Sequence, residues 1–189
     1  MDDVDVANRF FTVLALAADA AVLVLAAGLL VRPLRRRVVA AVGPPAVPLA
    51  LVVATGATLG SLYYSEVADF TPCLLCWYQR ICMYPLVPIL AVGVWRRDPA
   101  VRLYAAAFVV VGAPVSLYHW LVERVPSLAD SVACSATTPC SVPYFEELGF
   151  VTLAWMALSA FLLIGLLLLT STIGARASER TPIGQAGDA

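Results

Sequence analysis

The sequence has 189 residues, of which 61% are hydrophobic and 13% charged, and its mean hydropathy is +0.88. Soluble globular domains are about half apolar and about a quarter charged, so this composition excludes an ordinary water-soluble enzyme. Twelve basic residues, all of them arginine, stand against 13 acidic residues and give a net charge of −1, which leaves no basic excess for binding nucleic acid. The length suits one domain, which we expect to lie in membrane lipid.

Five apolar segments are long enough to cross a bilayer as helices, which takes roughly 20 mostly apolar residues. They cover residues 11–31, 46–64, 77–95, 103–122 and 150–170. Transmembrane strands alternate apolar and polar residues, whereas these segments are uniformly apolar, so the expected fold class is an all-α membrane protein. The acidic N-terminus differs from the basic start of a signal peptide, and we therefore expect the first segment to be retained. Pro85 is expected to kink the third segment.

The arginines are sorted to one side of the five segments. Nine of the 12 follow the first, third or fifth segment, and acidic residues gather at the opposite ends. Cytoplasmic loops are enriched in arginine, so we expect a multi-pass protein of the cell membrane with its N-terminus outside and its C-terminus in the cytoplasm. Four cysteines then face the outer compartment, where disulfides persist: Cys73, Cys76, Cys134 and Cys140. Cys82 lies inside the third segment and is expected to point elsewhere.

Cys73 and Cys76 form a Cys-x-x-Cys pair at the expected start of the third helix. The dipole and the unpaired backbone N–H groups of a helix N-terminus favour a thiolate there. Arg80 follows Cys76 by four residues, so both share one helical face and the guanidinium adds a positive charge near the second sulfur. A cation within the membrane indicates a functional site. The pattern therefore predicts a redox-active pair.

Other interpretations of the cysteines stay open at this point. A Cys-x-x-Cys pair can be a structural disulfide or half a zinc site, and four cysteines can ligate zinc tetrahedrally. No metal is expected, because an oxidising compartment disfavours free thiolates and because five residues separate Cys134 from Cys140. Haem attachment is excluded, since Trp77 follows Cys76 where that motif has histidine. Two structural disulfides would leave the position of Arg80 unexplained.

Two further polar residues lie within the expected spans. His119, the single histidine, lies near the outer end of the fourth segment and is either a proton relay or a hydrogen-bonded packing residue. Asp19 lies in the first segment. Three interpretations stay open for it: it pairs with an arginine, it lines a cavity, or it is a single acidic residue that the span tolerates. Aromatic residues near the cysteine pair, such as Trp77 and Tyr78, are expected to be interfacial anchors.

The residues Cys-Leu-Leu-Cys-Trp-Tyr-Gln-Arg from Cys73 to Arg80, followed by Met-Tyr-Pro at 83–85, resemble the signature of the DsbB family of quinone-dependent disulfide-forming membrane proteins, especially its shorter Gram-positive-type and archaeal members. The resemblance covers roughly residues 46–170 and implies a four-helix transmembrane bundle with both termini in the cytoplasm. The first segment is then an addition that puts the N-terminus outside. We expect an extra helix and a cytoplasmic Arg-rich loop in 1–45, a catalytic domain in 46–172, and a flexible cytoplasmic tail in 173–189.

The resemblance implies a thiol-disulfide oxidoreductase that reoxidises a soluble DsbA-like thioredoxin-fold partner and passes the electrons to membrane quinone, either ubiquinone or menaquinone. The partner would attack the Cys134–Cys140 disulfide at Cys134, and the electrons would then pass to Cys73 and Cys76 by thiol–disulfide exchange. In this family the second thiolate of the Cys-x-x-Cys pair, here Cys76, forms a charge-transfer or adduct species with quinone. Arg80 would stabilise its negative charge, and His119 is a candidate member of the quinone site.

Two alternatives remain from the sequence. One is a quinone-linked enzyme of the vitamin K epoxide reductase type, which also couples two cysteine pairs, although Trp-Tyr-Gln-Arg at 77–80 favours the DsbB family. The other is a non-catalytic membrane subunit with two structural disulfides, which would be indifferent to the loss of Arg80.

Overall fold

The computed structural model describes residues 3–129, 134 and 137–179. These residues form eight helices and no strand. In chain order the helices are α1 (Asp3–Leu30), α2 (Arg32–Val42), α3 (Ala46–Glu66), α4 (Leu74–Met83), α5 (Leu86–Arg96), α6 (Val101–Arg124), α7 (Pro126–Ala129) and α8 (Leu153–Glu179).

Five helical stretches in the described part of the chain are long and apolar enough to cross a membrane, namely α1, α3, α4 with α5, α6, and α8 as far as Ala177. The prediction of an all-α membrane protein with five spans is confirmed. The first helix starts at Asp3, earlier than predicted, because Asp3 and Asp5 suit the first turn of a helix, where the dipole favours negative charge. The third span is divided at Pro85, which separates α4 from α5 as expected.

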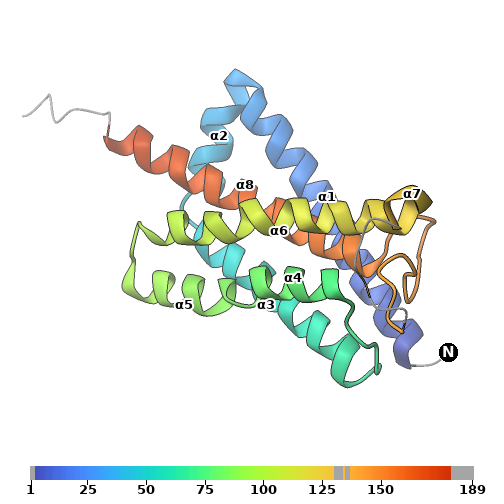
Figure 1. Ribbon diagram of the computed structural model, residues 1–189. Coiled ribbons are helices and arrows are strands. Elements are labelled where there is room, and N and C mark those ends of the chain that lie inside the picture. The colour runs from blue at the N-terminus through green and yellow to red at the C-terminus, as the bar shows by residue number, and fades with distance from the viewer. Residues whose placement is uncertain (1–2, 130–133, 135–136, 180–189) are drawn as a thin grey trace, which may run out of the picture.

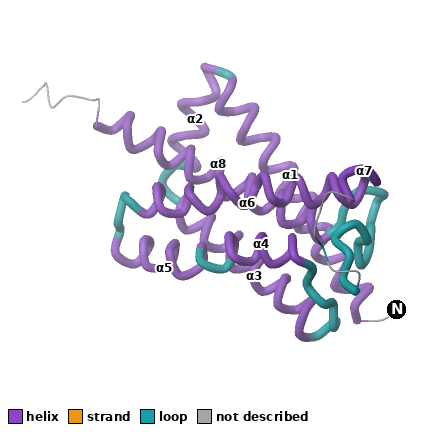
Figure 2. Tube along the Cα trace, in the orientation of Figure 1, coloured by secondary structure: helices purple, strands orange, loops and turns teal. Residues whose placement is uncertain are grey.

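The helices α3, α4 with α5, α6 and α8 lie side by side, and α1 packs against α8 (Figure 1). Figure 2 shows the connection from α3 to α4 and the segment 137–152 before α8 at one end of the bundle, with the start of α1 beside them. The turn between α5 and α6 lies at the other end. The segments that contain the paired cysteines therefore meet at one end of the molecule.

The core lies around α8, whose Phe161 and Ile164 are fully buried. Gly112 of α6 lies directly under the Phe161 ring, so closely that a Cβ atom there would overlap the ring. Ala50 and Ala54 of α3 are also fully buried and lie one helical turn apart. Small residues let helix backbones approach closely, which is how helices associate where the surrounding lipid is as apolar as the core.

Two expected boundaries differ from the structure. The segment that was expected to be an Arg-rich loop is helix α2, whose early proline suits a first turn and whose arginines are exposed. The expected tail is helical in its first part, because α8 continues to Glu179. Arg176 in its last turn suits the negative end of the helix dipole. Residues 180–189 of that tail lie outside the described residues.

Candidate active site

Cys73 and Cys76 lie at the start of α4, where Cys73 is the N-cap residue. The Cys73 backbone is extended, and its Sγ accepts a hydrogen bond of 3.3 Å from the backbone N–H of Cys76. Both side chains are free thiols, and their sulfur atoms lie 2.9 Å apart. The unpaired N–H groups and the dipole at a helix start favour negative charge, so this position stabilises a thiolate on Cys73.

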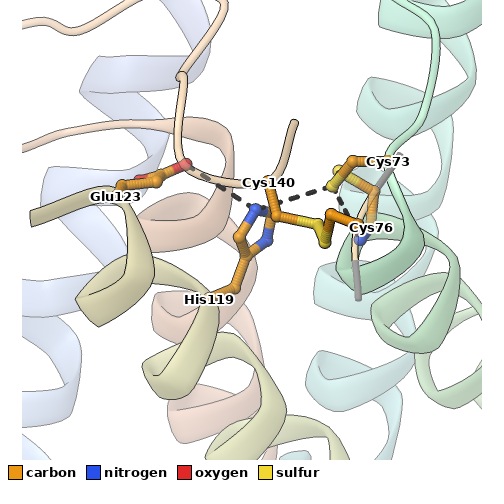
Figure 3. Close-up of a disulfide and its surroundings, with 6 residues drawn as sticks. Cys73, Cys76, His119, Glu123 and Cys140 are labelled. Carbon is orange, nitrogen blue, oxygen red and sulfur yellow. Dashed lines mark hydrogen bonds and ion pairs between the residues drawn. A yellow bond between two sulfur atoms is a disulfide. The ribbon is translucent and has the colours of Figure 1, made fainter. Parts of the chain in front are cut away.

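Helix α6 places a histidine and a carboxylate beside Cys73. His119 Nε2 lies 3.6 Å from Cys73 Sγ and 3.9 Å from Glu123 Oε1 (Figure 3). Glu123 also accepts a hydrogen bond of 2.6 Å from the Thr152 hydroxyl, and Thr152 in turn caps the start of α8. The side chains of His119 and Glu123 are only 4% exposed. These groups can take up a proton from Cys73 at His119 Nε2 in a site shielded from solvent.

The surroundings of Cys73 make it more acidic than an ordinary cysteine. The hydrogen bond with the Cys76 thiol has the largest effect, and the hydrogen bond and charge of His119 act in the same direction. Burial opposes them but is outweighed, so the pKa of Cys73 is lowered to about 4. In the reduced pair Cys73 is therefore a thiolate at neutral pH, the form that takes part in disulfide exchange.

The second cysteine pair is a disulfide between Cys134 and Cys140. Cys140 is only 3% exposed and packs in one apolar cluster with Cys73 and Val122, while Cys134 is half-buried at the edge of that cluster. Figure 3 shows Cys140 lying beside Cys73 and Cys76. Disulfide exchange requires one sulfur to reach another. The fold packs the two pairs into one apolar cluster, although they are far apart in the sequence.

A cavity of about 480 Å³ adjoins the first cysteine pair. It lies between α1, α3, α4 and α8, and its lining is mostly apolar. The polar and reactive residues of the lining include Tyr64 of α3 and Cys76, Gln79 and Arg80 of α4. His119, which was expected at the quinone site, does not line this cavity. The two sulfurs of one motif thus have different neighbours, since Cys76 lines the cavity and Cys73 contacts His119.

Arg80 is held in place at the cavity wall. Its Nη2 donates a hydrogen bond of 3.1 Å to the backbone carbonyl of Ser61. Its guanidinium lies 5.5 Å from the centre of the Trp77 ring and 5.9 Å from that of Tyr84, whose hydroxyl is hydrogen-bonded to the Ser61 side chain. Cation–π contacts of this kind hold a guanidinium without neutralising it. Arg80 therefore brings a positive charge to the cavity that Cys76 also lines.

Comparison with known proteins agrees with this geometry. The sequence profile described as "Disulfide bond formation protein DsbB" matches residues 44–171, which include both cysteine pairs and Arg80. The chain belongs to the DsbB family. It is therefore a membrane disulfide-forming protein and an oxidoreductase. Helix α1 lies entirely outside the matched residues.

Several DsbB-family relatives carry names that agree with this assignment. The chain is 46% identical over 113 residues to Disulfide bond formation protein C of Bacillus subtilis, which covers 60% of this chain and 82% of the relative. It is 45% identical over 113 residues to Probable disulfide formation protein C of Halalkalibacterium halodurans, with the same coverage of 60% and 82%. A Probable disulfide formation protein of Coxiella burnetii is 41% identical over 114 residues, which cover 60% of this chain and 78% of the relative. No solved structure matches the chain significantly.

The grouping of Cys73, Cys76 and His119 also resembles part of a metal site, since their ligand atoms lie within 4.8 Å of one another. A tetrahedral zinc ion with Zn–S bonds of about 2.3 Å would hold two thiolates roughly 3.8 Å apart. The observed separation of 2.9 Å is shorter than two zinc-bound thiolates would have. The four-cysteine zinc site considered from the sequence does not fit either, because Cys134 and Cys140 are joined to each other.

Several residues of the site were not predicted from the sequence. Glu123 follows His119 by four residues, so their shared helical face was a usable signal. Gln79 lies within the recognised motif, but Tyr64 and Thr152 come from distant segments and carry no signal of their own. Among the predicted anchors, Trp77 and Tyr78 are exposed, as interfacial aromatic residues are. Cys82, which was expected to point elsewhere than the cysteine pair, lies in the apolar core.

Proposed function

We propose that this protein reoxidises a DsbA-like thioredoxin-fold protein outside the cytoplasm and passes the electrons to membrane quinone. The proposal rests above all on the position of the first cysteine pair. Cys73 packs with Cys140 of the loop disulfide, and Cys76 lines an apolar cavity that also contains Arg80. Electrons entering at the loop disulfide would thus leave at the cavity.

The distribution of charge supports an outward-facing site. The exposed arginines of α2 and those around the turn between α5 and α6 lie at the end of the bundle away from the cysteines (Figure 1). Arginine is enriched on the cytoplasmic side of membrane proteins. The N-terminus and both cysteine pairs would then be outside and the C-terminus in the cytoplasm, where α8 ends.

The cavity suits a quinone chemically. A quinone is a flat apolar ring with carbonyl oxygens that need hydrogen-bond donors, and when bound it supplies an acceptor for two electrons and two protons. Tyr64 Oη and Gln79 Nε2 are buried and have no hydrogen-bond partner within the described residues. Both residues line the cavity together with Arg80. Buried donors without partners are unfavourable, so a ligand with oxygen acceptors would stabilise them.

The first step would take place at the loop disulfide. A thiolate of the reduced partner attacks Cys134 Sγ, a bond forms between these sulfurs, and the Cys134–Cys140 bond breaks to leave a thiolate on Cys140. The second partner thiol then displaces Cys134, so the partner is oxidised and the loop pair is reduced. Attack at Cys134 is favoured because it is half-buried, whereas Cys140 is almost fully buried.

The second step would transfer the electrons to the first pair. The Cys140 thiolate attacks Cys73 of the oxidised Cys73–Cys76 disulfide and releases Cys76, and Cys134 then attacks Cys140 and releases Cys73 as a thiolate. The Cys76 N–H and His119 stabilise this leaving thiolate. The products are a restored loop disulfide and two thiols at Cys73 and Cys76, which is the arrangement in the structure.

The last step would take place at the cavity. Cys76 is the sulfur on the cavity side and delivers the electron pair, while Arg80 stabilises the negative charge that develops there. The Cys73 thiolate then closes the bond to Cys76. The pair thereby gives up two electrons and two protons: one proton comes from the Cys76 thiol, and the other is the one that Cys73 has passed to His119 Nε2, which lies next to its sulfur and beside Glu123.

A purified-protein assay tests this function directly. The protein is mixed with a reduced DsbA-like protein and a soluble quinone analogue, and the quinone absorbance is followed. We expect quinone reduction by the wild type and by Cys82→Ser, whose thiol lies in the core, and none by Cys76→Ser or Cys134→Ser. If the wild type passes no electrons to quinone, the proposed function is wrong, and a scaffold with structural disulfides becomes the better account.

A further inference from the structure

Helix α1 is an addition to the part of the chain that matches the DsbB family, yet it contributes five residues to the cavity: Phe11, Leu14, Ala15, Ala17 and Ala18. We propose that α1 forms one wall of the quinone site and holds the apolar tail of the quinone against α3, an inference that rests on the function proposed above. The end of the cavity that is lined by Cys76 and Arg80 would hold the quinone ring.

The cavity extends along α1 away from the cysteine pair. Phe11 packs near Tyr64, with ring centres 5.6 Å apart, at the level where Arg80 is bonded to Ser61. Ala18 lies seven residues further along α1, which is roughly 10 Å at 1.5 Å per residue. On α3 the lining likewise continues from Tyr64 back to Val53. The cavity is therefore longer than a single ring requires, and its far part is apolar.

Small side chains keep the space between α1 and α3 open. Ala15 and Ala18 face the cavity from α1, and Gly56 and Ala57 face it from α3. At Gly56 an added Cβ atom would have no atom within 4 Å. Gly56 is exposed, so the cavity is open to the surroundings of the bundle at this position. Together with Cys76 and Arg80 at its other end, this open apolar length suits a ligand with a polar ring and a hydrocarbon tail.

Two contacts fix α1 in this position. Near the cysteine end, the Phe11 ring rests on Gly60 of α3, where an added Cβ atom would lie 2.8 Å from Phe11 Cε1. Further along, Asp19 Oδ2 accepts a hydrogen bond of 2.9 Å from Trp155 Nε1 of α8. A carboxylate within the bilayer is unfavourable without a partner. Asp19 and Trp155 do not line the cavity, so they act as positioning residues.

The test uses the full chain and compares two substitutions on α1. Ala18→Phe fills the far part of the cavity, whereas Val13→Phe adds the same group at a lipid-facing position that is 64% exposed and does not line the cavity. We expect Ala18→Phe to raise the KM for a long-tailed quinone about tenfold, which corresponds to about 1.4 kcal/mol, because the added ring takes the volume that the tail would occupy. A tail-less quinone and the quinone-independent exchange with the partner should be unaffected, and Val13→Phe should resemble the wild type.

Asp19 provides a second, independent test. Asp19→Leu removes the acceptor for Trp155 and should also raise the KM for the long-tailed quinone, while Asp19→Asn keeps an oxygen acceptor and should restore it. The inference is overturned if the wild type reduces quinone but neither Ala18→Phe nor Asp19→Leu changes this KM, or if Val13→Phe changes it equally. If the wild type reduces no quinone at all, the proposed function itself fails, and the inference fails with it.

Discussion

At the scale of single residues, the site depends on the different surroundings of two neighbouring sulfurs. Cys73 contacts His119 and packs with Cys140, whereas Cys76 lines the cavity with Arg80. A sulfur that exchanges with another disulfide benefits from a stabilised thiolate. A sulfur that reacts with a lipid-soluble oxidant must reach the apolar side. One short motif thus supplies both sides of the proposed electron transfer.

The lowered pKa of Cys73 gives a prediction about pH. The Cys73 thiolate forms at a lower pH than that of an ordinary cysteine, because its pKa is lowered, and it is lost as the pH falls through this lowered pKa. His119→Ala removes one of the contacts that lower the pKa, so the thiolate should form only at higher pH. The ultraviolet absorbance of the reduced protein measures this titration, and Leu117→Ala, an exposed neighbour on α6, is the control. An unchanged titration in His119→Ala would show that His119 does not act on Cys73.

The loss of Arg80 should weaken quinone binding and leave the reaction with the partner protein unchanged. Arg80→Ala removes a hydrogen-bonded charge from the cavity wall, which is worth about 1.5–3 kcal/mol, so we expect the KM for quinone to rise about tenfold to a hundredfold. The rate at which the reduced partner opens the Cys134–Cys140 disulfide should not change. Arg102→Ala, at the other end of the bundle and bonded to the Ser171 carbonyl, serves as the control. An equal rise in the KM for quinone in both variants would argue against a local role of Arg80.

At the scale of helices, the contact between α6 and α8 tolerates little added volume. Gly112→Ala places a methyl group into the Phe161 ring, so we expect a loss of about 1–3 kcal/mol in unfolding free energy. The midpoint of thermal unfolding in detergent should fall. Gly56→Ala is the matched control, since its methyl group meets no atom within 4 Å. If both variants unfold at the same temperature as the wild type, the packing at Gly112 is not as tight as described.

The five spans and the position of the Cys-x-x-Cys pair were predictable, because both depend on local sequence. Long apolar segments have few alternatives in a bilayer, and Cys73 begins a helix as its place before the third segment predicts. The helix α2 was not predicted, since its dense arginines are equally typical of a loop. The partner of Asp19 could not be found either, because Trp155 lies 136 residues away and only the packing of α1 on α8 brings them together.

At the scale of the whole molecule, the two cysteine pairs and the cavity lie in a row, and each step of the proposed transfer needs only neighbouring groups. The loop between α7 and α8 presents Cys134, the start of α4 provides the intermediate pair, and the cavity lies beyond it. In the proposed transfer, electrons would enter from a soluble protein at Cys134 and leave at the cavity.

The entry point can be tested by trapping. In Cys140→Ser, Cys134 is a free thiol, so the oxidised partner is added: Cys134 attacks the partner's disulfide and one partner thiol is released. Cys140 can no longer resolve the mixed disulfide, which should accumulate as a reducible band of higher mass on a non-reducing gel. Cys82→Ser should show no such band. If trapping requires Cys73 or Cys76 while the loop pair is dispensable, the order of the two pairs is wrong.

The most direct test of the central claim is a single turnover without quinone. One equivalent of reduced partner is added to the oxidised protein, free thiols are alkylated, and mass spectrometry identifies the labelled cysteines. We expect the label on Cys73 and Cys76, with the Cys134–Cys140 disulfide intact. When quinone is added before alkylation, this label should be lost. Two results would contradict the proposed order of electron transfer. One is labelling that remains on Cys134 and Cys140, and the other is a failure of quinone to oxidise the thiols of Cys73 and Cys76.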